Sequence, residues 1–159
     1  MISRRQGFSL LELLIVITII LIISAIAIPR LLTVKQLANS TAAVANLRSL
    51  DNALTAYTTQ YPAIGYPANL PVLAGSGSVP NSTAALLTDS LLANATVPDR
   101  AKQSYFFTYT PGSGTPVTTY NLTATPLGSS VSRSFFTDQT GEIHYHDGAT
   151  ASASDPLIG

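Results

Sequence analysis

The sequence contains no cysteine and no tryptophan, and only 10% of its 159 residues are charged. Without cysteine the chain can form no disulfide, and neither thiol chemistry nor a cysteine-held metal is available to it. Eight Lys and Arg balance eight Asp and Glu, so no excess of positive charge favours nucleic acid as the main partner. The remaining composition, rich in small and uncharged polar residues, is more typical of an exported protein than of a cytosolic enzyme.

The most unusual stretch lies near the N-terminus, where the 21 residues from Phe8 to Ile28 contain one ionisable side chain, Glu12. A helix of that length spans roughly 31 Å, about the thickness of the hydrocarbon core of a bilayer. Arg4 and Arg5 precede the run, and the positive-inside rule places them on the cytoplasmic side. The sequence therefore predicts one N-terminal membrane helix that carries an exported domain.

Glu12 predicts a functional site within this helix. A carboxylate in a membrane segment costs on the order of a few kcal/mol on insertion, and it ordinarily has a partner. No Lys, Arg or His lies between Glu12 and Arg30, so a cationic partner has to come from outside the helix. If the chain were cut after Gly7, the new amino group of Phe8 would lie one turn from Glu12. The Phe8 ammonium of a staggered second chain could then pair with this carboxylate, which favours assembly into a polymer.

The order RRQG (residues 4–7), FSLLE (8–12) and an apolar run ending at Pro29 resembles the N-terminus of type IV pilin and type II secretion pseudopilin precursors. The resemblance covers about residues 4–30. It implies that a prepilin peptidase cuts after Gly7 and that Phe8 is then N-methylated. It also implies that Glu12 pairs with the N-terminus of a neighbouring subunit during filament assembly, and that Pro29 kinks the helix.

The resemblance implies a structural filament subunit and no enzyme. The expected partners are further copies of the chain, other pilins, the prepilin peptidase and an inner-membrane assembly platform. The precursor is expected in the inner membrane as a single-pass protein with a cytoplasmic N-terminus, and the subunit afterwards in a periplasmic or extracellular filament. Cleavage before Phe8 removes Arg4 and Arg5, which leaves six basic against eight acidic residues and a net charge of −2.

Three alternatives remain open at this stage. A pilus subunit and a secretion pseudopilin share this N-terminus. A protein of a different class, a non-polymerising extracytoplasmic binding protein, could be anchored by an uncleaved helix. A cleaved secretory signal is the third, because the sequence AIA at residues 25–27 has the small-residue pattern of a signal peptidase site.

The pattern of the rest of the chain predicts an α+β fold, in which a long N-terminal helix packs against a small antiparallel sheet, as in type IV pilins. Apolar residues recur every three or four positions beyond Pro29, as on one face of a helix: Leu37, Thr41, Val44, Leu47, Leu50, Leu54, Tyr57 and Tyr61. After Pro98 the period changes to two, which predicts strands over residues 104–110, 117–123, 133–137 and 142–146.

These patterns divide the chain into six segments. We expect a leader peptide (1–7), the membrane and assembly half of the helix (8–29), its amphipathic half (30–61), a loop region (62–101), a four-stranded sheet (102–147) and a flexible tail (148–159). Within the loop region, a short helix is predicted from about Ser82 to Leu92, with its N-terminus at the sequence NST (81–83).

No catalytic, cofactor or metal site is predicted. His144 and His146 are the only histidines, and alternation along a strand places them on the same face, beside Asp147. Two ligands of this kind are a weak signal for a metal, so a pair of surface histidines on an edge strand is favoured. The remaining carboxylates of the predicted head flank turns and are expected to be solvated: Asp89, Asp99, Asp138 and Glu142.

Overall fold

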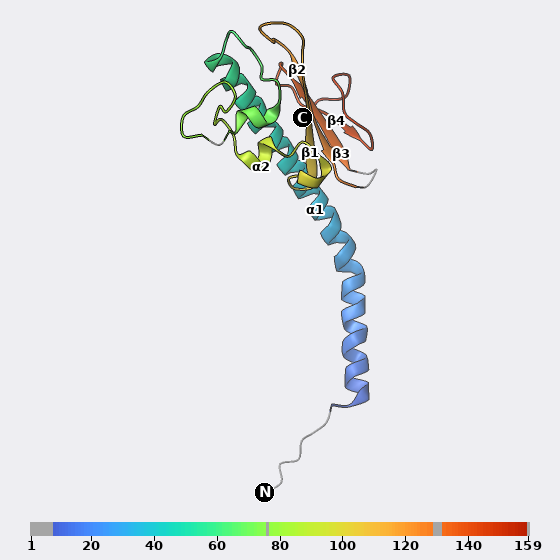
Figure 1. Cartoon of the computed structure of the whole chain (residues 1–159). Helices are drawn as coiled ribbons and strands as arrows, with labels where there is room; N and C mark the ends of the chain where they lie inside the picture. The colour runs from blue at the N-terminus through green and yellow to red at the C-terminus, as the bar shows by residue number, and fades with distance from the viewer. Residues whose placement is uncertain (1–7, 76, 129–131, 159) are drawn as a thin grey trace. The chain divides into compact units, whose positions relative to one another are not determined.

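The structure is a computed structural model that describes residues 8–75, 77–128 and 132–158 (Figure 1). The predicted leader 1–7, with the expected cleavage site at Gly7, lies outside the described residues. The chain divides into two compact units, residues 1–37 and 38–159, and one long helix, α1 (Leu10–Gln60), contributes residues to both. Each unit is described by itself below.

The first unit consists of the apolar part of α1. The helix is long and apolar enough to cross a membrane, in agreement with the predicted membrane segment. The helix continues through Pro29, although proline has no N–H to donate to the carbonyl of Ala25 one turn earlier. The Thr33 hydroxyl donates a hydrogen bond to the Pro29 carbonyl at 3.2 Å. The helix therefore passes the proline without ending, and the kink expected there remains a prediction.

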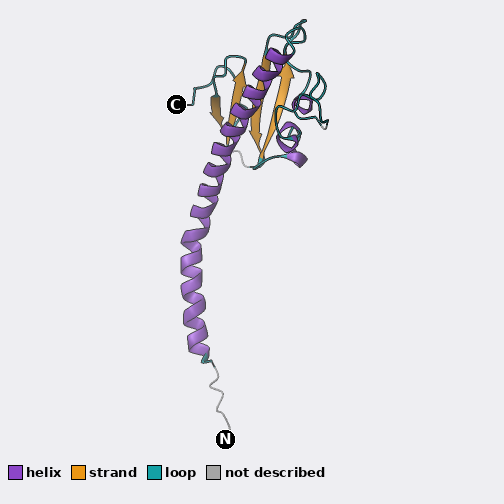
Figure 2. Ribbon diagram, turned by 90° about the vertical axis from the view of Figure 1, so that its left-hand side faces the viewer, coloured by secondary structure: helices purple, strands orange, loops and turns teal. Residues whose placement is uncertain are grey.

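The second unit combines the C-terminal part of α1 with a four-stranded sheet. The strands are β1 (Tyr105–Pro111), β2 (Tyr120–Pro126), β3 (Arg133–Asp138) and β4 (His144–Asp147). Their spatial order is β1-β2-β3-β4, and each strand is antiparallel to its neighbours. Figure 2 shows this part of α1 lying across one face of the sheet. The predicted α+β fold with a four-stranded antiparallel sheet is confirmed.

The core lies between α1 and that face of the sheet. Register places Phe107, Ala124 and Phe135 in one row across three strands, and their side chains belong to the same buried cluster. Four residues of the predicted helix stripe join this cluster: Leu47, Leu50, Leu54 and Tyr57. The stripe does not extend to Leu37, which is 67% exposed. The 3.6-residue period thus identified the buried face of the helix but not the point at which burial begins.

Short helices and turns connect α1 to the sheet. The 3-10 helices η1 (Leu70–Leu73) and η2 (Pro98–Arg100) each have a proline in the first turn, where its missing N–H costs no helical bond. The amide of Phe107 donates to the carbonyl of Ala95 at 2.7 Å. This connecting chain thereby covers the outer edge of β1, which would otherwise present unpaired backbone groups.

The helix predicted from about Ser82 to Leu92 is wrong; the helix in this region is α2 (Ser90–Ala93), which is much shorter. The side chain of Asn81 accepts a hydrogen bond from the Thr83 amide at 2.9 Å, which favours a local turn over a helical start. The Leu87 amide donates to a carbonyl of η1 at 2.7 Å. Backbone groups that a helix would use internally are therefore bonded to η1.

The segment expected to be a flexible tail, residues 148–159, makes backbone contacts in its described part, up to residue 158. The amide of Tyr145 donates to the Pro156 carbonyl, and the amide of Ile158 donates to the Ile143 carbonyl, both at 2.9 Å. Ala151 is buried. The polar composition of the tail does not reveal these contacts, because the tail is held through backbone groups at the edge of β4.

Candidate functional site

Ser9 and Glu12 form the N-terminal cap of α1. The Ser9 hydroxyl oxygen accepts a hydrogen bond from the Leu11 amide at 3.3 Å, and the Glu12 Oε2 atom accepts one from the Ser9 amide at 2.9 Å. This reciprocal arrangement is a capping box, and it satisfies backbone donors that the first turn leaves unpaired. The sequence signal for it is the S-x-x-E spacing of residues 9–12, which involves no cationic partner.

The capping box gives Glu12 a partner within the single subunit. The carboxylate lies in the first turn of α1, where the positive end of the helix dipole stabilises an anion. Within the described part of the chain, the bond to Ser9 involves only Oε2, so Oε1 can accept a further hydrogen bond from a cation. The start of α1 therefore has the chemistry to bind a second chain's ammonium group.

Apolar side chains make up most of the surface of the first part of α1. Every Leu, Ile and Val from Leu10 to Leu37 is at least 46% exposed in the single chain. A helix that is apolar on all sides is stable in lipid or among other helices, but not in water. Phe8, which precedes the helix, is 80% exposed.

Of the predicted site residues, Phe8 and Glu12 both lie at the start of α1. Pro29 lies within the helix, and Gly7 is outside the described residues. The roles assigned to them remain predictions.

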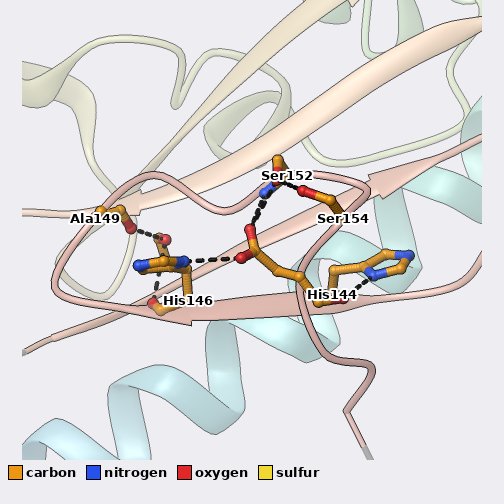
Figure 3. A network of polar contacts seen from close by, with 7 residues as sticks. His144, His146, Ala149, Ser152 and Ser154 are labelled. Carbon is orange, nitrogen blue, oxygen red and sulfur yellow. Dashed lines mark hydrogen bonds and ion pairs between the residues drawn. The ribbon is translucent and has the colours of Figure 1, made fainter.

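The two histidines lie on β4, at the edge of the sheet, and both contact Asp155. The Nδ1 atom of His144 lies 2.6 Å from the Asp155 carbonyl oxygen, and the Nδ1 atom of His146 lies 2.8 Å from the Asp155 carboxylate. Both oxygens only accept, so each Nδ1 carries a proton. Figure 3 shows the rings of His144 and His146 lying apart from each other. They therefore act as two separate hydrogen-bond donors to the C-terminal segment.

This geometry does not bring the histidines together as ligands. Among the described residues, no group of three or more His, Cys, Asp and Glu side chains is placed to hold a metal ion. The expectation of surface histidines on an edge strand is right about the strand, but both side chains are only partly exposed. Asp155, the residue that engages them, carried no signal in the sequence.

Asp155 is the centre of a small polar network (Figure 3). Its Oδ2 atom accepts hydrogen bonds from the Ser152 amide at 2.6 Å and from the Ser152 hydroxyl at 2.9 Å. The hydrogen bond from His146, and then those from Ser152, hold the pKa of the Asp155 carboxyl below its usual range. The carboxylate is therefore charged throughout the range in which histidine titrates.

Asp89 is exposed, as expected of a solvated carboxylate, and it has a structural role as well. Its Oδ1 atom accepts a hydrogen bond from the Leu92 amide at 2.8 Å, which caps α2, and its Oδ2 atom pairs with the Lys102 ammonium at 2.9 Å. The hydrogen bond from Lys102, followed by that from Leu92, lowers the pKa of Asp89. Asp138 likewise bonds the amide and hydroxyl of Thr140.

The geometry defines an α+β protein with a pilin-like fold, whose N-terminal helix is long and apolar enough to cross a membrane. Residues 2–28 match the family model of the prokaryotic N-terminal methylation motif. The chain thus carries the prepilin-type signature of type IV pilins and pseudopilins. No curated protein and no solved structure matches the chain. The motif supports a pilin-like or pseudopilin-like precursor, points to a structural protein, and implies processing by a prepilin peptidase and assembly into filaments.

Proposed function

We propose that this chain is the precursor of a subunit of a type IV pilus-like filament. The precursor is held in the inner membrane by the apolar part of α1, is cut between Gly7 and Phe8, is N-methylated on Phe8 and then polymerises. The observation that carries this proposal is the methylation motif over residues 2–28, combined with a helix whose apolar side chains are exposed on all sides.

In this proposal, Glu12 changes partners during assembly. In the single subunit its carboxylate bonds the Ser9 amide. In the filament it accepts a hydrogen bond from the Phe8 ammonium of a neighbouring subunit, so that both the donor and the acceptor are charged. Membrane and filament core are both apolar, so transfer between them releases little hydrophobic free energy. Packing between helices and the pairing of Glu12 therefore have to favour assembly.

The proposal is tested by replacing Glu12 with glutamine. Glu12→Gln removes the charge but keeps an oxygen that can cap Ser9, so membrane insertion and cleavage should continue. Loss of a hydrogen bond between charged groups should lower incorporation into filaments by about ten-fold or more. Glu12→Ala, which removes the cap as well, should be at least as defective. The amount of subunit in sheared filaments, relative to the processed subunit in the envelope, measures this.

Glu142→Gln is the matched control, because Glu142 is an exposed glutamate of the second unit. It should assemble like the unmodified chain. Normal incorporation of Glu12→Gln would show that the charge of Glu12 is not needed for docking. A processed subunit that polymerises only within the envelope would favour a type II secretion pseudopilin over a surface pilus. A chain that retains residues 1–7 and never polymerises would favour an anchored binding protein.

A further inference from the structure

The C-terminal segment, residues 149–158, follows the outer edge of β4. Leu157 forms an antiparallel bridge with His144, flanked by the two backbone hydrogen bonds that join Tyr145 to Pro156 and Ile158 to Ile143. The segment therefore occupies the position of a short fifth strand. It covers backbone groups at the sheet edge that would otherwise be free to pair with another chain.

The segment also covers part of the sheet face opposite α1. Ser134 pairs with His146 in the register of β3 and β4, so both side chains lie on that face. The Ser134 hydroxyl donates to the Ala149 carbonyl and lies 3.3 Å from the His146 carbonyl, and Ser134 is only 1% exposed. The side chains of His144 and His146 on β4 both contact Asp155 of the segment (Figure 3).

We propose that residues 149–158 form a latch over the edge of β4, and that His146 makes closure of this latch dependent on pH. In the closed state the His146 Nδ1 atom lies 2.8 Å from the Asp155 carboxylate. A neutral imidazole donates an ordinary hydrogen bond there, whereas an imidazolium forms an ion pair. Closure is therefore stronger when the His146 imidazole is protonated than when it is neutral.

The charges around His146 support this assignment. Asp147, the next residue of β4, pairs with Arg133 of β3 through an Nε-to-Oδ1 distance of 2.8 Å, so these two charges compensate each other. His144, two residues earlier, donates to a carbonyl and gains no ion pair when it is protonated. Among the described residues, Asp155 is the acid that pairs with His146.

The latch has a physical consequence for the sheet. When it opens, the Tyr145 amide and the Ile143 carbonyl lose their partners, and β4 becomes an unprotected edge strand. An edge strand of this kind can accept a strand from another chain. The pH of the exported compartment would thereby set how often this edge is available.

Hydrogen exchange of the full chain in detergent micelles tests the latch. The probes are the amides of Tyr145 and Ile158, and the readout is the protection factor at pH 5 and pH 8, corrected for intrinsic exchange. We expect protection to be about two- to five-fold greater at pH 5, the range that measured ion pairs of this kind support. The Phe107 amide, at the opposite edge of the sheet, should show no such change and serves as an internal control.

Two variants assign the effect to His146. His146→Asn keeps a donor near the position of Nδ1 but cannot be protonated, so it should abolish the pH dependence while the amides stay partly protected. Asp155→Asn should abolish it as well. His144→Asn should lower protection at both pH values and leave their ratio unchanged. Equal protection at pH 5 and pH 8 in the unmodified chain, or a ratio that survives in His146→Asn, would overturn the proposal.

Discussion

The carboxylate of Asp51 accepts a hydrogen bond from the hydroxyl of Tyr120, and this contact joins α1 to β2 within the second unit. Tyr120 is only 2% exposed. Burial, and then the hydrogen bond to Asp51, raise the pKa of the Tyr120 hydroxyl, so it keeps its proton and remains a donor. Because the donor lies in the core and the acceptor on the helix, the bond helps to hold the C-terminal part of α1 against the sheet.

Tyr120→Phe should therefore destabilise the protein. It removes the donor and leaves a partly buried carboxylate without this partner, which should lower the free energy of unfolding by about 1.5–3 kcal/mol. Tyr61→Phe is the matched control, since no hydrogen bond of its hydroxyl is seen among the described residues, and it should change stability by less than about 0.5 kcal/mol. Urea unfolding followed by tyrosine fluorescence measures both. Equal effects of the two substitutions would mean that the bond to Asp51 contributes nothing specific.

A second prediction concerns Asp89, which caps α2 and pairs with Lys102. Asp89→Ala should cost about 1 kcal/mol, the usual value for losing an N-cap, while Asp89→Asn keeps the cap and should cost less. The pKa of Asp89 is lowered in the folded protein. Its charge therefore stabilises the fold above the pKa of the unfolded carboxyl, and this contribution disappears as the pH falls through the folded pKa.

The difference in stability between Asp89→Asn and the unmodified chain should thus be present at pH 7 and vanish near pH 2. Thermal unfolding across this range checks it. A difference that is constant with pH would show that the charge of Asp89 plays no part.

A third prediction concerns Thr137, which lies in β3 and is 1% exposed. Its hydroxyl oxygen is buried and has no hydrogen-bond partner among the described residues. Thr137→Val has nearly the same shape and removes this hydroxyl, so it should stabilise the protein by about 1 kcal/mol. Thr108→Val, at an exposed position of β1, is the control and should have little effect. If Thr137→Val were destabilising instead, the hydroxyl would have to be satisfied in solution, for example by water.

The parts of the fold that depend on local periodicity could be predicted from the sequence. Leu47, Leu50 and Leu54 recur at helical spacing and are all buried against the sheet. The alternation around Phe107 likewise identified β1. In both cases one side of a helix or strand faces the core. The spacing of apolar residues along the sequence therefore indicates which side is buried.

The parts that depend on contacts between distant segments could not be predicted. The region after Asn81 resembles a helix start, but its backbone groups bond to η1 instead. The C-terminal segment looks like a loose polar tail, and only the fold brings Asp155 to His146. The bond between Ser9 and Glu12 is different, because its spacing is local and the sequence does contain the signal.

The most direct test of the proposed function is mass spectrometry of the N-terminal peptide, taken in parallel from sheared surface material and from the cell envelope. Cleavage after Gly7 and methylation predict a peptide that begins with N-methylated Phe8, and a pilus subunit predicts that this peptide is present in the sheared filaments. The same peptide confined to the envelope would favour a pseudopilin or a minor pilin. A chain that begins at Met1, or at Ile28 after signal peptidase cleavage, would contradict the central claim.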